Sequence, residues 1–181
     1  MNIYGRILKL FGWSVSVSTP DYPKCIICVA PHTSNWDFII GKLAYASTGR
    51  KTGFLMKESW FFWPLGPIFR AIGGVAVPRG RKHGPSLTET LIEKYRNSRR
   101  LVLAITPEGT RSRTCQWHTG FLRIAFEAKV PVVLAVIDFE KKTAMMEQTF
   151  EPSGNIDADM AAIKQYYRPF KGRYPDKFCA E

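Results

Sequence analysis

Two short runs of apolar residues, 25–30 and 101–105, constrain the fold of this chain more than any other feature of its sequence. Neither run alternates with polar residues, so each would be buried on both faces, as strands are inside a sheet that helices cover. Stretches with helical spacing separate them, and no internal repeat or linker interrupts the order. We therefore predict an α/β fold in a single domain, residues 1–181, with a mostly apolar central sheet flanked by helices.

Local patterns predict the remaining elements. Further strands are expected at 13–17, 74–77, 131–137 and about 144–150, and helices at about 35–47, 117–128 and 157–167. Ser86 and Glu89 form a capping box, which predicts another helix that begins there. Residues 78–83, just before it, read Pro-Arg-Gly-Arg-Lys-His and are expected to be a basic loop.

The charge of the chain indicates the chemistry of its partner. A chain of 181 residues, 45% of them hydrophobic, is large enough for one domain with a buried core. Its 26 Lys and Arg residues against 15 Asp and Glu residues give a formal net charge of +11. Such a charge implies an anionic partner, namely nucleic acid, a phospholipid surface or a phosphorylated substrate, and does not choose among them.

The cysteines are too scattered for a ligand cluster. Cys25 and Cys28 are close in sequence, but strand alternation would place them on opposite faces, and Cys115 and Cys179 stand apart. We therefore expect neither a zinc site nor a disulfide framework, and we infer a reducing compartment.

A histidine and an aspartate follow the first apolar run. The run ends at Pro31 and His32 comes next, while Ser34 is a candidate N-cap for the following helix. Asp37 would then lie in the first helical turn, where a carboxylate suits the helix dipole. A histidine held by a nearby carboxylate is a general base, because the carboxylate fixes its tautomer and stabilises the imidazolium that forms.

A second polar motif follows the other apolar run, with the sequence Thr-Pro-Glu-Gly-Thr-Arg-Ser at 106–112. Gly109, between a carboxylate and a hydroxyl, lets the backbone turn tightly, and Arg111 offers a planar fork of donors suited to phosphate. Both polar motifs leave the ends of apolar strands, where open α/β sheets place their sites. His83 and His118 lack such a setting and are expected at the surface.

Two stretches are candidates for contact with a membrane. Ile3, Ile7, Leu8 and Phe11 recur at helical spacing within residues 1–17, which predicts a short amphipathic helix that either lies on a membrane or packs on the core. The aromatic residues of the second stretch fit a buried core or a bilayer interface, and we favour the interface because the N-terminal stripe and the charge agree with it. These residues are Trp60, Phe61, Phe62, Trp63 and Phe69.

The residues favour acyl transfer without a protein nucleophile. No Gly-x-Ser-x-Gly elbow is present, so direct attack by a substrate hydroxyl on an activated acyl group is the simplest reaction for His32 and Asp37. A thioesterase or other hydrolase using the same pair, with or without a metal, is an alternative, although two such ligands make a poor metal site. A nucleic-acid-binding module would explain the charge but not the two polar motifs.

Four matches in the same order make the chain similar to the glycerolipid acyltransferases typified by lysophosphatidic acid acyltransferase. The first motif of that family, His-x4-Asp, is matched by His32 and Asp37, and the third, Pro-Glu-Gly-Thr-Arg-Ser, by residues 107–112. The weaker second and fourth motifs resemble residues 73–79 and 130–136. Together they cover about 25–137, which the resemblance implies is the motif-bearing core of an acyltransferase domain.

The resemblance also implies roles for individual residues. His32 would be the base on the acceptor hydroxyl and Asp37 its orienter. The residues implied to bind or shape the site for the acceptor's anionic head group are Arg79, Glu108, Gly109, Thr110 and Arg111. Pro31 stands where many members carry an asparagine, and Leu134 where the fourth motif usually has a second proline. The first departure bears on the geometry around His32 and the second on packing.

The reaction that the resemblance implies moves a fatty acyl chain from acyl-CoA or acyl carrier protein to the hydroxyl of a lysophospholipid. The expected acceptor is 1-acyl-sn-glycerol-3-phosphate, in phospholipid biosynthesis, and another lyso-lipid such as an amino-acid lipid is the alternative. The acyl donor is a substrate, so no cofactor, metal or nucleic acid is expected. The chain is short for the family and shows no membrane-spanning segment, so we expect a peripheral protein on the cytoplasmic side of a membrane.

Overall fold

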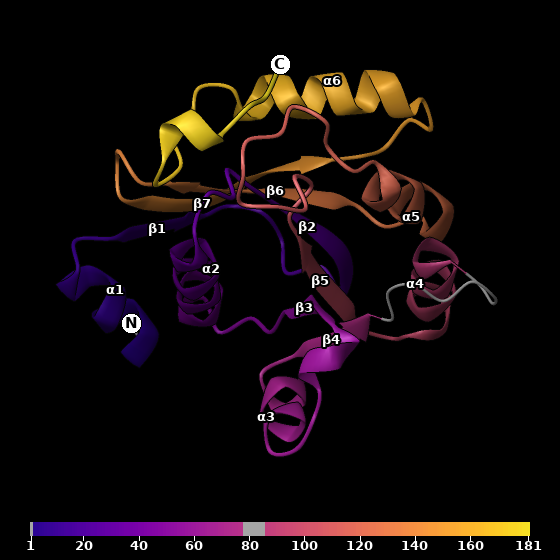
Figure 1. The fold of residues 1–181 in the computed structure, drawn as a ribbon, viewed down its shortest axis with the longest axis horizontal. Helices are drawn as coiled ribbons and strands as arrows, with labels where there is room; N and C mark the ends of the chain where they lie inside the picture. Colours follow the sequence, from indigo (N-terminus) through magenta and orange to yellow (C-terminus); the bar gives the residue numbers. More distant parts are fainter. Residues whose placement is uncertain (1, 78–85) are drawn as a thin grey trace.

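A computed structural model describes residues 2–77 and 86–181. Within these ranges, seven strands form one sheet in the order β1-β7-β6-β2-β5-β3-β4 (Figure 1). The strands are β1 (Ser14–Val17), β2 (Lys24–Ala30), β3 (Gly53–Lys57), β4 (Gly74–Val77), β5 (Leu101–Ile105), β6 (Val132–Asp138) and β7 (Thr143–Phe150). The α-helices are α1 (Ile3–Leu10), α2 (Asn35–Ser47), α3 (Leu65–Ala71), α4 (Leu87–Asn97), α5 (Gly120–Ala128) and α6 (Ile156–Tyr167). The predicted α/β fold, with a central sheet flanked by helices, is confirmed.

The strand β2 lies inside the sheet and sets its register. It pairs in parallel with β5 on one side and with β6 on the other, so that Cys28 faces both Ile105 and Leu134. Only β6 and β7 pair antiparallel among the strands described. Ile26 and Cys28 are fully buried, as the unbroken apolar run of β2 requires.

Helices cover both faces of the sheet (Figure 1). On one face, Tyr95 of α4, Leu122 of α5 and Ile163 of α6 join the largest buried cluster. On the other face, α2 packs through Tyr45 and Ile40, and α1 packs on α2. Two buried layers therefore hold β2 and β5 in place, and with them the loops that leave their ends.

Most predicted boundaries agree with the structure, and two regions differ. The strand at 74–77 and the helix at 35–47 have the predicted bounds, whereas α5 begins at Gly120 and not at 117. The preceding residues have other partners, since the His118 amide donates to the Pro107 carbonyl at 2.8 Å. The elements β3 and α3, in the aromatic stretch, were not predicted from the sequence.

The apolar stripe of α1 divides between the core and solvent. Leu8 is buried beside α2, whereas Ile3, Ile7 and Phe11 are exposed. The helix therefore packs on the core through Leu8 and buried Gly5, and it presents Ile3, Ile7 and Phe11 outward. Within residues 2–77 and 86–181, no helix has both the length and the apolar character needed to cross a bilayer.

A disulfide joins Cys115 to Cys179, 64 residues apart in the sequence. The expectation that the cysteines stay unpaired is therefore wrong for these two, and the inference of a reducing compartment loses that support. Cys25 and Cys28 are free and buried, as strand positions inside the sheet would be. Distant segments meet at Cys179, which the spacing of the cysteines could not show.

Candidate active site

The two polar motifs lie side by side because β2 and β5 are parallel neighbours. Cys28 is paired with Ile105, so the chain leaves both strands at the same edge of the sheet. His32 follows the end of β2, and Glu108 follows the end of β5. The His32 amide donates to Glu108 Oε1 at 2.9 Å, although 76 positions separate the two residues.

Asp37 is held rigidly in the first turn of α2. Its Oδ2 accepts from the amides of Thr33 at 2.7 Å and Ser34 at 2.8 Å, and its Oδ1 accepts from the Ser34 hydroxyl at 2.7 Å. The predicted capping position of Ser34 is confirmed, and Asp37 serves as the reciprocal acceptor at the third helical position. The carboxylate is 2% exposed, so its orientation is set by these three donors.

His32 and Asp37 face one another across the start of the helix. His32 Nδ1 lies 3.2 Å from Asp37 Oδ2. The contact is close but off the line of a hydrogen bond, and buried Nδ1 has no other hydrogen-bond partner among the residues that the structure describes. The two groups are close enough to form a hydrogen bond after a small rotation, and hydrogen bonds at catalytic sites commonly align only when substrate is bound. The other ring nitrogen, Nε2, is left for a substrate.

Glu108 is buried behind the histidine. Burial raises the pKa of Glu108 to about 8, the His32 amide acts against that rise, and the charge of Asp37 adds to it. Its carboxyl group contacts the backbone of His32 and does not line the cavity described below. Glu108 therefore ties the second polar motif to the first.

The turn that follows Glu108 places a cation beside α2. Gly109 has a φ of 65°, and a Cβ at that position would lie 2.5 Å from the His118 ring, so both the conformation and the space favour glycine. Arg111 is exposed, and its Nη1 donates to Asn35 Oδ1. The Thr110 hydroxyl accepts from the Ser112 amide at 3.1 Å, which shapes the turn.

A cavity of about 1100 Å³ opens beside His32. Its polar lining includes His32, Arg111 and His118, and its apolar lining includes Phe38 of α2 and Phe54 of β3. Cavities of this size accept molecules as large as drugs or cofactors. The arrangement can therefore hold a long apolar group with a polar end next to the imidazole.

The structure brings together most of the site residues predicted from the sequence. His32, Asp37, Glu108, Gly109 and Arg111 lie around one edge of the sheet, with Thr110 in the same turn. Arg79 lies outside the described residues. Their roles in binding substrate stay predictions.

Two residues at the site were not predicted. Asn35 holds Arg111, and His118, which the sequence placed at the surface, is exposed but also lines the cavity against Gly109. Asn35 lies between His32 and Asp37 in the sequence, and this position could have indicated that it belongs to the site. No pattern in the sequence marked His118, because only the path of the loop after β5 brings it to Gly109.

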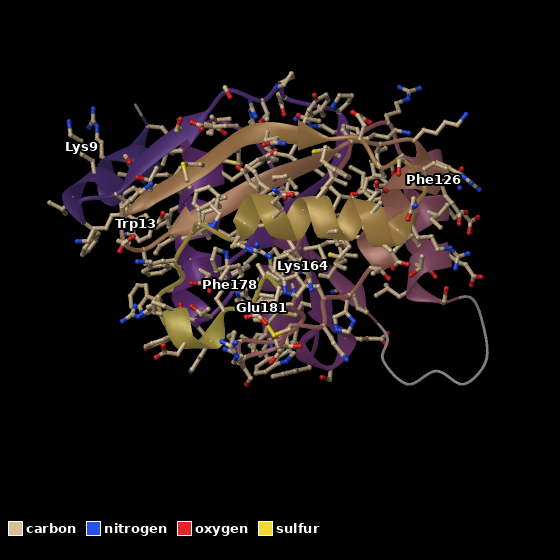
Figure 2. The ribbon with its side chains drawn as sticks, turned by 90° about the horizontal axis from the view of Figure 1, so that it is seen from above. Lys9, Trp13, Phe126, Lys164, Phe178 and Glu181 are labelled. Carbon is tan, nitrogen blue, oxygen red and sulfur yellow. A yellow bond between two sulfur atoms is a disulfide. The ribbon has the colours of Figure 1, made fainter. Side chains whose placement is uncertain are left out.

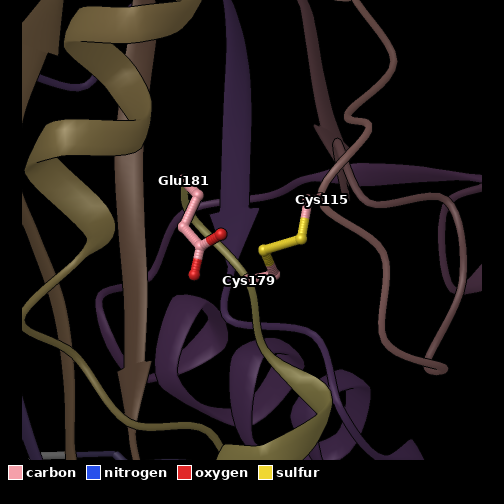
Figure 3. A group of neighbouring side chains, drawn as sticks. All are labelled: Cys115, Cys179 and Glu181. Atoms are coloured by element: carbon pink, nitrogen blue, oxygen red, sulfur yellow. A yellow bond between two sulfur atoms is a disulfide. The ribbon is translucent and has the colours of Figure 1, made fainter.

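A group of residues of metal-ligating types lies near the end of the chain. Among the described residues, Cys115, Cys179 and Glu181 are the only group whose sulfur and carboxylate atoms lie within 4.8 Å of one another (Figure 3). The two sulfurs are bonded to each other, and Lys164 Nζ donates to backbone oxygens of Cys115 and Glu181. A disulfide beside an ammonium group is a poor cation site.

An imidazole beside a buried carboxylate, next to a partly apolar cavity at the carboxyl ends of parallel strands, is an arrangement that can support general-base chemistry in an α/β protein. The sequence model of the Acyltransferase family matches residues 16–138, more than half of the chain. The chain belongs to the acyltransferase family, which confirms the predicted resemblance.

Curated relatives agree with that assignment. The chain is similar to the 1-acyl-sn-glycerol-3-phosphate acyltransferase of Salmonella typhimurium, with 26% identity over 140 residues, and to that of Escherichia coli strain K12, with 25% identity over 139 residues. Each alignment covers 73% of this chain and 56% of the relative. The chain thus spans a little over half the length of the relatives it matches.

Proposed function

We propose that the protein transfers a fatty acyl chain from acyl-CoA or acyl carrier protein to the hydroxyl of a lysophospholipid, with 1-acyl-sn-glycerol-3-phosphate as the acceptor. The observation that carries this proposal is the His32–Asp37 pair at the wall of a large, partly apolar cavity, beside Arg111. The names of the relatives supply the acceptor. Acyl donor and acceptor are both substrates, so the proposed reaction needs no cofactor.

In the proposed reaction, His32 is the base and Asp37 its charged partner. His32 Nε2 takes the proton of the acceptor hydroxyl as the oxygen attacks the thioester carbonyl, and Asp37 stabilises the resulting imidazolium. The tetrahedral intermediate expels the thiolate, which receives the proton from His32. An ester bond forms and a thioester bond breaks, and no protein group is acylated.

The acceptor's phosphate has a candidate partner next to the base. Arg111 is exposed, lines the cavity and is steadied by Asn35. A guanidinium fork binds phosphate oxygens in pairs, which would fix the acceptor hydroxyl at a set distance from His32. Such positioning distinguishes a transferase from a hydrolase, in which water must reach the same carbonyl.

The test is an assay of thiol release from a long-chain acyl-CoA, with and without 1-acyl-sn-glycerol-3-phosphate, together with mass spectrometry of the lipid product. The proposal predicts acceptor-dependent thiol release with formation of diacylated lipid in the wild type. In His32→Ala the rate should fall by about 10²-fold or more. Asp37→Asn should lower the rate as well. Asp157→Asn, at an exposed carboxylate in the first turn of α6, is its matched control and should retain the wild-type rate.

Release of thiol without acceptor, abolished in His32→Ala, would replace the transferase with a thioesterase. Transfer to a lysolipid without a phosphate, at the same rate as to the phosphorylated acceptor, would contradict the role of Arg111. Full activity in a folded His32→Ala variant would remove the general base from the proposal.

We also propose that the protein binds peripherally to an anionic membrane surface. Trp63 is 83% exposed and Phe62 and Ile68 lie near it on the segment that leads into and through α3. Trp60 of the same segment lines the cavity, so a lipid tail could enter the cavity from a bilayer without crossing water. The net charge of +11 would strengthen this contact with anionic lipids.

Sedimentation with vesicles of phosphatidylcholine and phosphatidylglycerol tests the membrane proposal. The Phe62→Ser, Trp63→Ser double variant should bind less well than the wild type, and added salt should weaken binding of both. Phe126→Ser is the matched control, because Phe126 is 50% exposed on α5, away from α3 (Figure 1). Equal loss in both variants, or in neither, would contradict a membrane role for the α3 segment.

A further inference from the structure

The last part of the chain lies against the loop that carries His32. Gly172 is buried, and a Cβ added there would lie 2.7 Å from Thr33 Oγ1 and 3.1 Å from Pro31 Cβ. The Tyr174 amide donates to Thr33 Oγ1 at 3.2 Å. The residues on both sides of His32 are thus packed against the segment 172–180, called the tail below.

The other end of the tail holds the loop that follows β5. Cys179 is bonded to Cys115 (Figure 3). The Cys179 carbonyl also accepts from Trp117 Nε1 at 2.9 Å. Arg113 Nη1 donates to the carbonyls of Asp176 and Phe178, each at 3.3 Å. The tail therefore bridges the loop of the general base and the loop of the phosphate-binding turn.

The loop after β5 depends on these contacts for its position. Residues 106–119 contain no helix or strand. Within the loop, the Gly109 amide donates to the Thr106 carbonyl at 3.1 Å, and the His118 amide donates to the Pro107 carbonyl. Lys164 of α6, labelled in Figure 2, donates to the Cys115 carbonyl at 2.7 Å and also to a backbone oxygen of Glu181.

We propose that the Cys115–Cys179 disulfide positions the turn at 108–111 for the acyl acceptor, and that its reduction by a dithiol weakens acceptor binding. Among the described contacts between the tail and this loop, the disulfide is the only covalent one. In the reduction, the two thiols of the dithiol become a disulfide, and their electrons and protons pass to Cys115 and Cys179. The inference rests on the proposed function, because the acceptor is what the turn would bind.

The buried thiols make the experiment selective. Burial raises the pKa of Cys25 and of Cys28 to about 12, so neither forms a reactive thiolate in the folded protein. Iodoacetamide should therefore add to the native protein only after a dithiol has been used, and then to Cys115 before Cys179, because Cys179 is buried. Label on Cys115 or Cys179 before reduction would show a free thiol there and would overturn the inference.

The first readout is steady-state formation of diacylated lipid, followed by mass spectrometry because a dithiol would obscure thiol release. After reduction, alkylation and desalting, the KM for 1-acyl-sn-glycerol-3-phosphate should rise on the order of tenfold, the loss expected for one hydrogen bond to a charged group, with kcat nearly unchanged. A general loss of folded enzyme would lower kcat and leave KM unchanged. Cys115→Ser with Cys179→Ser should show the raised KM without treatment and should not respond to a dithiol.

The second readout does not depend on activity. Limited trypsin digestion should cut after Arg111 and Arg113 faster in the reduced protein, while cleavage after exposed Lys129, at the end of α5, stays at the same rate. Unchanged KM and unchanged cleavage would overturn the inference, and so would equal acceleration at all three sites. If no form of the enzyme makes diacylated lipid, the proposed function fails, and the digestion alone still decides whether the disulfide positions the loop.

Discussion

Replacing Glu108 by glutamine tests the buried carboxyl group behind His32. The carboxyl has a pKa of about 8 in the folded protein against an ordinary value of 4.5, with burial as the main cause. Between these two values the folded state holds a proton that the unfolded state has released. The free energy of unfolding therefore decreases as the pH rises from 4.5 to 8, by up to 1.36 kcal/mol per pH unit and by about 5 kcal/mol in total.

The glutamine variant removes this dependence and little else. Its amide cannot ionise, and its Oε1 can still accept the hydrogen bond from the His32 amide. From pH 5.5 to pH 7.5 the wild type should lose about 2–3 kcal/mol of stability relative to Glu108→Gln. In thermal melts this is a relative shift of roughly 5–10 °C for a chain of this size.

Urea unfolding of both proteins at pH 5.5 and pH 7.5 measures the effect, because groups that titrate in both proteins cancel in the comparison. The free energy of unfolding of the variant minus that of the wild type should be larger at pH 7.5 than at pH 5.5. A difference that is the same at both pH values would show that Glu108 is ionised in the folded protein, and would refute the argument from burial.

Three further substitutions have defined outcomes. Asp37→Asn should lower kcat by about 10²–10⁴-fold, measured with saturating donor and acceptor, since the amide cannot stabilise the imidazolium of His32. Gly109→Ala should raise the acceptor KM, because the added Cβ meets His118 and the φ of 65° is strained for alanine; a KM equal to that of the wild type would contradict this. Leu103→Ala, at a fully buried position of β5, should lower the free energy of unfolding by about 2–5 kcal/mol in urea, and a loss below 1 kcal/mol would show that the core collapses around it.

The parts of the site that could be predicted from the sequence depend on local signals. Pro31 ends β2, Ser34 begins α2, and Asp37 follows within one helical turn. Because His32 and Asp37 are joined by this short stretch, their approach is determined by a few neighbouring residues. The turn at Gly109 was predictable for the same reason.

The parts that could not be predicted depend on contacts between distant segments. Cys115 and Cys179 lie in stretches without periodicity, and only the fold shows that they meet. The bond from Arg111 to Asn35 likewise joins the loop after β5 to the first residue of α2. In the aromatic stretch, Pro64 and Pro67 flank or enter α3, and prolines at these positions conceal a helix from an analysis of periodicity.

The parallel pairing of β2 with β5 also has a consequence for folding kinetics. The loop that carries His32 and the turn that begins at Glu108 are 76 positions apart at their contact, so they meet only after a long segment of chain has closed. Closing such a segment costs conformational entropy before the contacts compensate for it, which makes pairings of this kind slow. Enzyme activity recovered after dilution from denaturant would therefore report completion of the central sheet, and not the earlier appearance of helices.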